Sequence, residues 1–195
     1  MTDRFIRTFI ITLALTFVFG YFFVGPASAQ RRDFMTDEEI ELIRDSQDID
    51  ARIEVLAKMI DRRFEVLGVD VGGWKQGGKH SDAWGAAPKG SRLEILSDIK
   101  KLLQKAIDDI DNLSEHPDSA PVREKGDKEA KKDPQRFSVA VRSLGQAAQR
   151  YLPAFRSQLD NSKADMEKGL LLASIDLSNQ IIEAIGKLPP EIKKK

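Results

Sequence analysis

Four stretches of the chain carry apolar residues at the three- and four-residue steps of an amphipathic helix. They cover residues 36–67, 91–115, 134–152 and 153–188, and the second follows the alternation of a coiled coil most strictly. No strand-like alternation separates them. The pattern therefore predicts an all-α fold, an antiparallel helical bundle of about four long amphipathic helices. The last stretch has the broadest apolar stripe, so we expect it to lie at the centre of the core.

Local signals indicate where these helices begin and end. Thr36 precedes Glu39 by three residues and Ser91 precedes Glu94 in the same way, which is the spacing of a capping box. Pro153 cannot donate a backbone hydrogen bond and clashes one turn back. We therefore expect the helix to kink or to restart there, which divides the helical stretches at residues 152 and 153.

Two connections of different composition separate the helices. Residues 68–90 form a loop that is rich in glycine and holds both tryptophans. Residues 116–133 mix both charge signs with two prolines and almost nothing apolar, which predicts a mobile charged linker. The first helical stretch is acidic, whereas residues 137–160 are net basic, so we expect these two to pack as neighbours.

The first 29 residues are typical of an export signal peptide. Arg4 and Arg7 precede an apolar run over residues 9–24, and Ala27 and Ala29 supply the small side chains that a signal peptidase reads. Cleavage would leave residues 30–195 as a single helical-bundle domain in the periplasm or outside the cell. The alternative is an uncleaved anchor through residues 9–24, which would tether the bundle to the membrane.

Composition removes several classes of function. The chain has no cysteine, which excludes thiol nucleophiles, disulfides and cysteine-ligated metals. Its 31 basic and 31 acidic residues balance, so no global field draws it to nucleic acid. We find no nucleotide-binding loop and no motif of a known hydrolase, and we expect no cofactor.

The acidic group on the second helix is a weak metal candidate. Asp108, Asp109 and Asp111 lie close to His116, and carboxylates with imidazole can bind transition metals. Their positions fall on the faces opposite or beside the apolar stripe, however, whereas bundle metal sites use ligands that face inward. A solvated acidic face is the favoured interpretation.

The loop over residues 68–90 holds the leading candidate site. Glycine-flanked tryptophans can form a stacking platform for a ligand, with polar side chains beside them. The opposing interpretation is that both rings fold back to close the open end of the bundle, and a third is that the loop is disordered. The candidate residues of the ligand or partner site are Trp74, Lys79, His80, Asp82 and Trp84.

The sequence favours an exported, non-enzymatic bundle that binds a partner or associates with the cell envelope. The near absence of catalytic motifs beside four well-patterned helices supports this hypothesis. The alternative hypothesis is a small-ligand binding protein that uses the loop around Trp74 and Trp84. A membrane partner is expected only if the leader stays attached.

Overall fold

The predicted all-α fold is confirmed. The structure, a computed structural model, describes residues 32–74, 81–116 and 134–189, and these ranges contain helices but no strand. From Phe34 onward, the described residues belong to one compact unit. The elements are α2 (Asp37–Asp45), α3 (Ile49–Val66), the short 3-10 helix η1 (Ser81–Trp84), α4 (Arg92–Glu115), α5 (Pro134–Asn161) and α6 (Asp165–Gly186).

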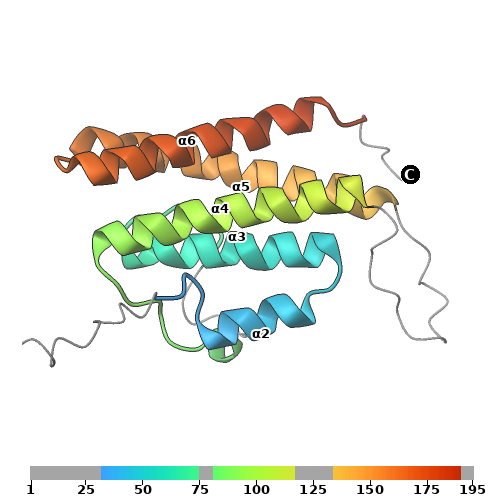
Figure 1. Ribbon diagram of the computed structural model, residues 1–195, viewed down its shortest axis with the longest axis horizontal. Helices are drawn as coiled ribbons and strands as arrows, with labels where there is room; N and C mark the ends of the chain where they lie inside the picture. The colour runs from blue at the N-terminus through green and yellow to red at the C-terminus, as the bar shows by residue number, and fades with distance from the viewer. Residues whose placement is uncertain (1–31, 75–80, 117–133, 190–195) are drawn as a thin grey trace, which may run out of the picture. The chain divides into compact units, whose positions relative to one another are not determined.

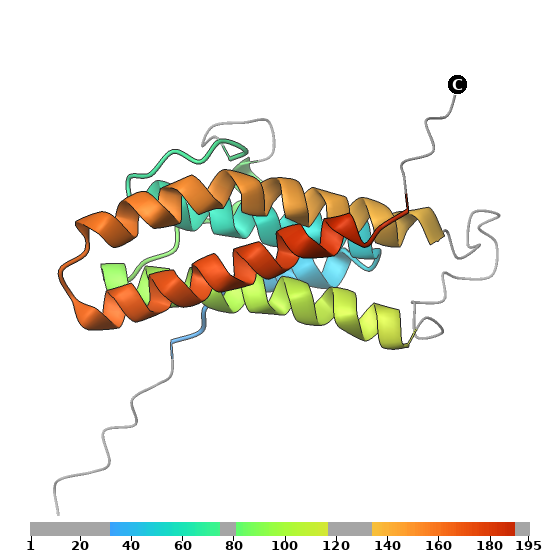
Figure 2. The same cartoon turned by 90° about the horizontal axis from the view of Figure 1, so that it is seen from above.

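The four long helices, α3 to α6, form a bundle in which the chain direction alternates (Figure 1). Helix α3 packs against α4 and α5, and α6 packs against the same two helices from the other side, so α3 and α6 lie at opposite corners. The view from above shows the same arrangement (Figure 2). The short helix α2 lies outside the bundle, against α3 and η1.

The core is centred on α3 and α4 rather than on the last helix. Ile53, Leu56 and Ile60 of α3 are fully buried, and α4 contributes an equally buried row. An aromatic group completes the core, in which Phe64 lies 5.4 Å from Tyr151 and 5.1 Å from Phe155 between ring centroids. Aromatic pairs at such spacing add to the stability that area burial gives.

The expectation for the last helix is wrong. The buried line of α6 consists of Leu171, Ser174, Ser178 and Ile181, so two of its four positions are small and polar. Both serine hydroxyls donate to a carbonyl of the previous turn of their own helix. Because α6 contacts only α4 and α5, its broad apolar stripe spreads over two flanks instead of entering the centre.

The predicted helix over residues 36–67 is two helices. Helix α2 ends at Asp45 and α3 starts at Ile49, with Asp48 in an extended conformation before it. Arg52 donates from Nε to the carbonyl of Ser46 at 3.0 Å, which satisfies a backbone acceptor at the break. The apolar spacing already lengthens there, since the step from Ile43 to Ile49 is six positions instead of three or four.

The expected helix boundary at Pro153 is also wrong. Helix α5 continues through Pro153 to Asn161, and the chain breaks over residues 162–164 instead. Pro153 and Gln149 are both exposed. The carbonyl of Gln149, which loses its helical donor, can therefore bind water, and the proline costs less than it would at a buried position.

The predicted packing of the acidic and basic helical stretches is present in the contact between α3 and α5. At the start of the interface, Arg136 forms an ion pair with Asp48, and its Nη1 atom lies 3.6 Å from Oδ1 of Asp50. Further along, Arg150 pairs with Asp61. Opposite charges thus meet along the same interface that buries the apolar stripes.

Several expectations fall outside the described residues. The export leader over residues 1–29 does, as does the charged linker beyond His116. Within the described ranges, no helix combines the length and the apolar character that crossing a bilayer requires.

Candidate functional site

Three consecutive charged residues are buried near the end of α3. Asp61 and Arg62 are 3% exposed and Arg63 is 1% exposed. Successive residues of an α-helix point about 100° apart, so these side chains leave α3 in three directions. The segments that pack around this turn therefore each meet a buried charge.

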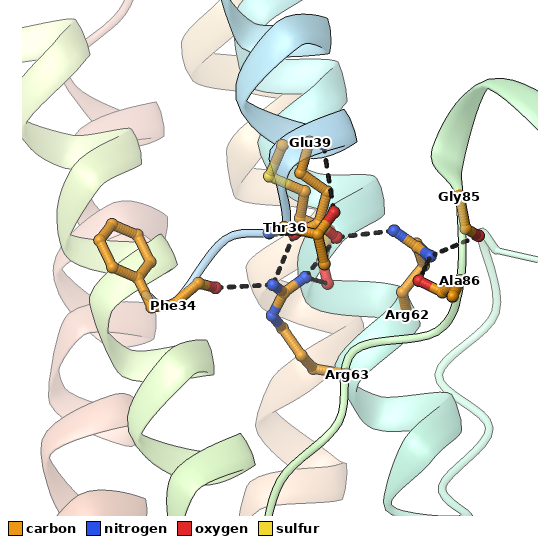
Figure 3. A network of polar contacts seen from close by, with 8 residues as sticks. Phe34, Thr36, Glu39, Arg62, Arg63, Gly85 and Ala86 are labelled. Atoms are coloured by element: carbon orange, nitrogen blue, oxygen red, sulfur yellow. Dashed lines mark hydrogen bonds and ion pairs between the residues drawn. The ribbon is translucent and has the colours of Figure 1, made fainter. Parts of the chain in front are cut away.

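Arg63 and Arg62 together hold Glu39 of α2 (Figure 3). Arg62 donates to Glu39 Oε1 at 2.7 Å, while Arg63 donates to Oε1 at 2.7 Å and to Oε2 at 2.6 Å. The backbone N–H of Thr36 adds a fourth hydrogen bond to Oε2, at 3.1 Å, as part of the capping box. Arg63 also donates to the carbonyl of Phe34 at 2.6 Å. The buried carboxylate is thus fully compensated.

Arg62 continues from this cluster to the tryptophan loop. It donates to the carbonyls of Gly85 at 3.3 Å and Ala86 at 2.8 Å. Its guanidinium carbon lies 5.4 Å from the ring centroid of Trp74 and 5.5 Å from that of Trp84. The two rings meet edge to face at 5.1 Å. Both tryptophans are therefore used as cation–π partners of the chain's own arginine.

Asp61 faces α5 on another side of α3. The hydroxyl of Tyr151 lies 2.7 Å from Asp61 Oδ1 and 3.0 Å from the carbonyl of Ala57. Arg150 stacks on the ring of Tyr151 and reaches the carboxylate of Asp61 at 3.4 Å. The same guanidinium donates to the carbonyls of residues 71 and 72. This contact fastens residues 70–74, here called the strap, onto the bundle.

Burial shifts the pKa values of Asp61, Tyr151 and Arg62. Loss of solvent raises the pKa of Asp61, although the hydrogen bond from Tyr151 and the charge of Arg150 act in the opposite direction. Burial also raises the pKa of Tyr151 well above its ordinary value, and the neighbouring carboxylate adds to that effect. On the other side of the helix, burial lowers the pKa of Arg62 while Glu39 opposes the change.

The structure describes three of the five candidate loop residues. Trp84 is 6% exposed and Trp74 is half-buried, and both lie on the side of α3 next to α2 instead of at an open end of the bundle. Asp82 is exposed in η1. Lys79 and His80 lie outside the described residues. A small-ligand role for this loop stays a prediction.

Two of the three candidate aspartates of α4 lie on its outer side. Asp108 and Asp111 are exposed and Asp109 is half-buried. Asp108 accepts a hydrogen bond from Gln104 one turn earlier, and Asp109 pairs with Lys105 at 3.1 Å. Among the described residues no group of histidine and acidic side chains is arranged to hold a metal ion. These contacts fit a solvated helix face.

Sequence reasoning did not find the buried charges at residues 61–63. The available signal was a run of three charged residues between Ile60 and Phe64, where the apolar stripe leaves room for only one polar face. Comparisons with known proteins find no family, no curated protein and no solved structure that matches this chain. The functional conclusion therefore rests on the geometry of the described residues.

Proposed function

We propose that this chain is an exported, non-enzymatic helical-bundle protein that acts as a partner-binding or envelope-associated interaction module. Its surface then carries the function, and the short helix α2 presents the contact face. A partner with a basic surface suits this face, because the exposed side chains of α2 are mainly acidic.

The observation that carries the proposal is the way in which α2 is fixed to the side of the bundle. Glu39 is completely buried against Arg62 and Arg63. Removing three charges from water is costly, and such a cluster adds little stability compared with apolar packing. What it does provide is a single position for the helix that bears it. This supports a role in which the orientation of α2 matters.

The exposed side chains of α2 are mainly acidic. Asp37, Glu38, Glu41 and Asp45 are all exposed, and the basic residue of the helix, Arg44, is paired with Glu41. By contrast, the large apolar side chains that the described residues expose are single positions on three different helices, which is normal for a protein surface. They are Val66, Val139, Met166 and Leu172.

Binding of the purified chain to an envelope extract tests this function. The double variant Glu41→Gln, Asp45→Asn removes two exposed carboxylates from α2. The matched control Asp176→Asn, Glu183→Gln removes two exposed carboxylates from α6. We expect the α2 variant to lose retention of a defined partner while the control keeps it, and we expect raised salt to weaken the same interaction.

Two results would contradict the proposal in different ways. Equal retention of the partner by both double variants would show that α2 is not the contact face. A substrate turned over by the chain in a panel of hydrolase assays would contradict the non-enzymatic role itself.

A further inference from the structure

The two buried carboxylates next to α3 are compensated to very different degrees. Glu39 receives three hydrogen bonds at 2.6–2.7 Å from two arginines. Asp61 faces one arginine, Arg150, whose nearest nitrogens lie 3.4 Å away, and its single short hydrogen bond comes from the neutral hydroxyl of Tyr151. A charge–charge hydrogen bond is normally 2.7–2.9 Å long, so the pair of Asp61 and Arg150 is a weak one.

The strap depends on this weak pair. Arg150 donates to the carbonyls of Val71, at 2.9 Å, and Gly72, and its guanidinium stays over α3 beside the carboxylate of Asp61. Gly73 sits so close that a Cβ atom added there would overlap both Asp61 and Arg150. Trp74 follows directly and packs on the second tryptophan. A movement of the Arg150 guanidinium therefore reaches the ring of Trp74 through Gly72 and Gly73.

We propose that Asp61, Arg150 and the strap form a latch that a proton operates. When the carboxylate of Asp61 takes up a proton from solvent, Arg150 loses its counter-charge and turns toward water, since its side chain is already 36% exposed. The strap then loosens, and Trp74 moves away from Trp84 and Arg62. The device uncovers aromatic surface in acid, independently of which partner α2 binds.

Charged and titratable groups face Asp61 from α3, α5 and the strap, and among the groups of the latch Asp61 is the one that changes protonation in acid. Helix α3 adds the attractive charge of Lys58, and α5 adds Arg150 and Tyr151. From the strap, Asp70 is turned to the backbone N–H of Gly72. Tyr151 stays neutral through the acid range because its pKa is raised well above the ordinary value. It continues to support residue 61 after protonation.

The sign of the pH dependence separates opening of the latch from unfolding. The pKa of Asp61 is higher in the folded chain than its ordinary value of 3.8. The folded state therefore binds this proton more readily than the unfolded state, and protonation of Asp61 favours the fold as the pH falls through the window above 3.8. Within the folded chain, Arg150 lowers the pKa of Asp61 and burial raises it. The latch therefore requires that loss of the charge of Arg150 raise this pKa by more than hydration of the carboxylate lowers it. Acid is then expected to loosen the strap while the helices persist.

Tryptophan fluorescence tests the latch directly, because the chain has two tryptophans and both lie at the strap or its partner segment. We would record emission wavelength and acrylamide quenching, with far-UV circular dichroism, on the full chain from about pH 7 down to about pH 4, the range over which a raised carboxyl titrates. The expected result is a red shift and stronger quenching in acid at constant helical signal.

Two variants and one control decide the outcome. Asp61→Asn should show the acid-like emission already at neutral pH and no further change with pH. Gly73→Ala should do the same by displacing the strap sterically, without removing the carboxylate. The control Asp82→Asn removes an exposed carboxylate near Trp84 and should keep the unmodified titration.

Three results would overturn the latch. The first is an emission spectrum of the unmodified chain that does not change with pH. The second is a pH titration that Asp61→Asn retains. The third is a loss of helical signal at the same pH as the red shift, which would mean that acid unfolds the bundle instead of opening the strap.

Discussion

Replacing Glu39 by glutamine should destabilise the protein strongly, although the two side chains have nearly the same size. The carboxylate accepts three short hydrogen bonds from Arg62 and Arg63 and one from the backbone of Thr36. Glutamine keeps one oxygen, but its amide NH₂ faces guanidinium donors where the second oxygen was. The substitution therefore removes the buried carboxylate that two buried cations share.

The magnitude follows from the burial of the partners. Arg62 and Arg63 are 3% and 1% exposed, so water cannot solvate them once the charge of Glu39 is gone. Removing one partner from a buried ion pair costs about 3–5 kcal/mol. Domains have a total free energy of unfolding of about 5–15 kcal/mol. A loss of that size should lower the melting temperature by about 6–20 °C in a chain of this length.

The same helix offers a matched control. Glu41 also pairs with an arginine at 2.6 Å, but both side chains of that pair are more than half exposed. Glu41→Gln should therefore cost about 0–1 kcal/mol, as surface ion pairs do. Urea and thermal denaturation followed by far-UV circular dichroism would compare the two variants. If Glu39→Gln proved no more destabilising than Glu41→Gln, the reasoning from burial would be refuted.

Three further predictions concern two glycines, Tyr151 and the processing of the chain. Gly145→Ala should lower the free energy of unfolding by about 1–3 kcal/mol, because its Cβ would overlap Ile185 of α6. Gly169→Ala lies at an open helical position and should raise this free energy by about 0.5–1 kcal/mol. Urea denaturation measures both, and equal effects would contradict the reasoning. Tyr151→Phe removes the hydroxyl that donates a hydrogen bond to the buried Asp61, so it should lower the free energy of unfolding by about 1–3 kcal/mol. It should also raise the pKa of Asp61 further, which NMR titration would measure. An unchanged pKa would contradict the assigned contact. Intact-mass spectrometry of the protein from its own host should give a chain that begins at Gln30; a full-length chain in an alkali-resistant membrane fraction would show an anchor instead.

Much of the secondary structure could be predicted because its signals are local. Both capping boxes form as their spacing indicates, with Thr36 and Glu39 at the start of α2 and Ser91 and Glu94 at the start of α4. In each case the hydroxyl and the carboxylate satisfy backbone groups three residues away, so no tertiary contact is needed. The helical ranges were therefore largely accessible from the sequence.

The two wrong boundaries have different causes. Pro153 was expected to end a helix, but it lies on an exposed side of α5 where water can replace the lost hydrogen bond. The break after Asp45 was missed because the apolar stripe resumes at Ile49. Periodicity reports which residues face the core, and it does not report whether the backbone between two stripes stays helical.

The buried charges could not be predicted because their partners are distant along the chain. Glu39 and Arg63 are separated by 24 residues, and Asp61 and Tyr151 by 90. Read alone, the run over residues 61–63 looks like a solvated helix face. Only packing of α2, the loop and α5 around α3 turns these side chains inward. Such pairings depend on tertiary structure, which local propensity does not encode.

The location of the arginines has a simpler physical explanation than the need for ion pairs. The segments that cross the end of α3 are irregular, so their backbone carbonyls have no helical donor and can accept hydrogen bonds from side chains. Arginine supplies five N–H donors in a fixed plane. Arg63, Arg62 and Arg150 use them on residues 34, 85–86 and 71–72 respectively.

Arg62 and Arg63 then need a counter-charge, because their burial leaves a cation without water, whereas Arg150 is partly exposed. Glu39 serves Arg62 and Arg63, and Asp61 serves Arg150. The acidic residues thus neutralise the arginines that bind the irregular segments. Because the contact between Asp61 and Arg150 is the longer one, the strap is held less tightly than α2. The strap should therefore loosen in acid while α2 stays in place.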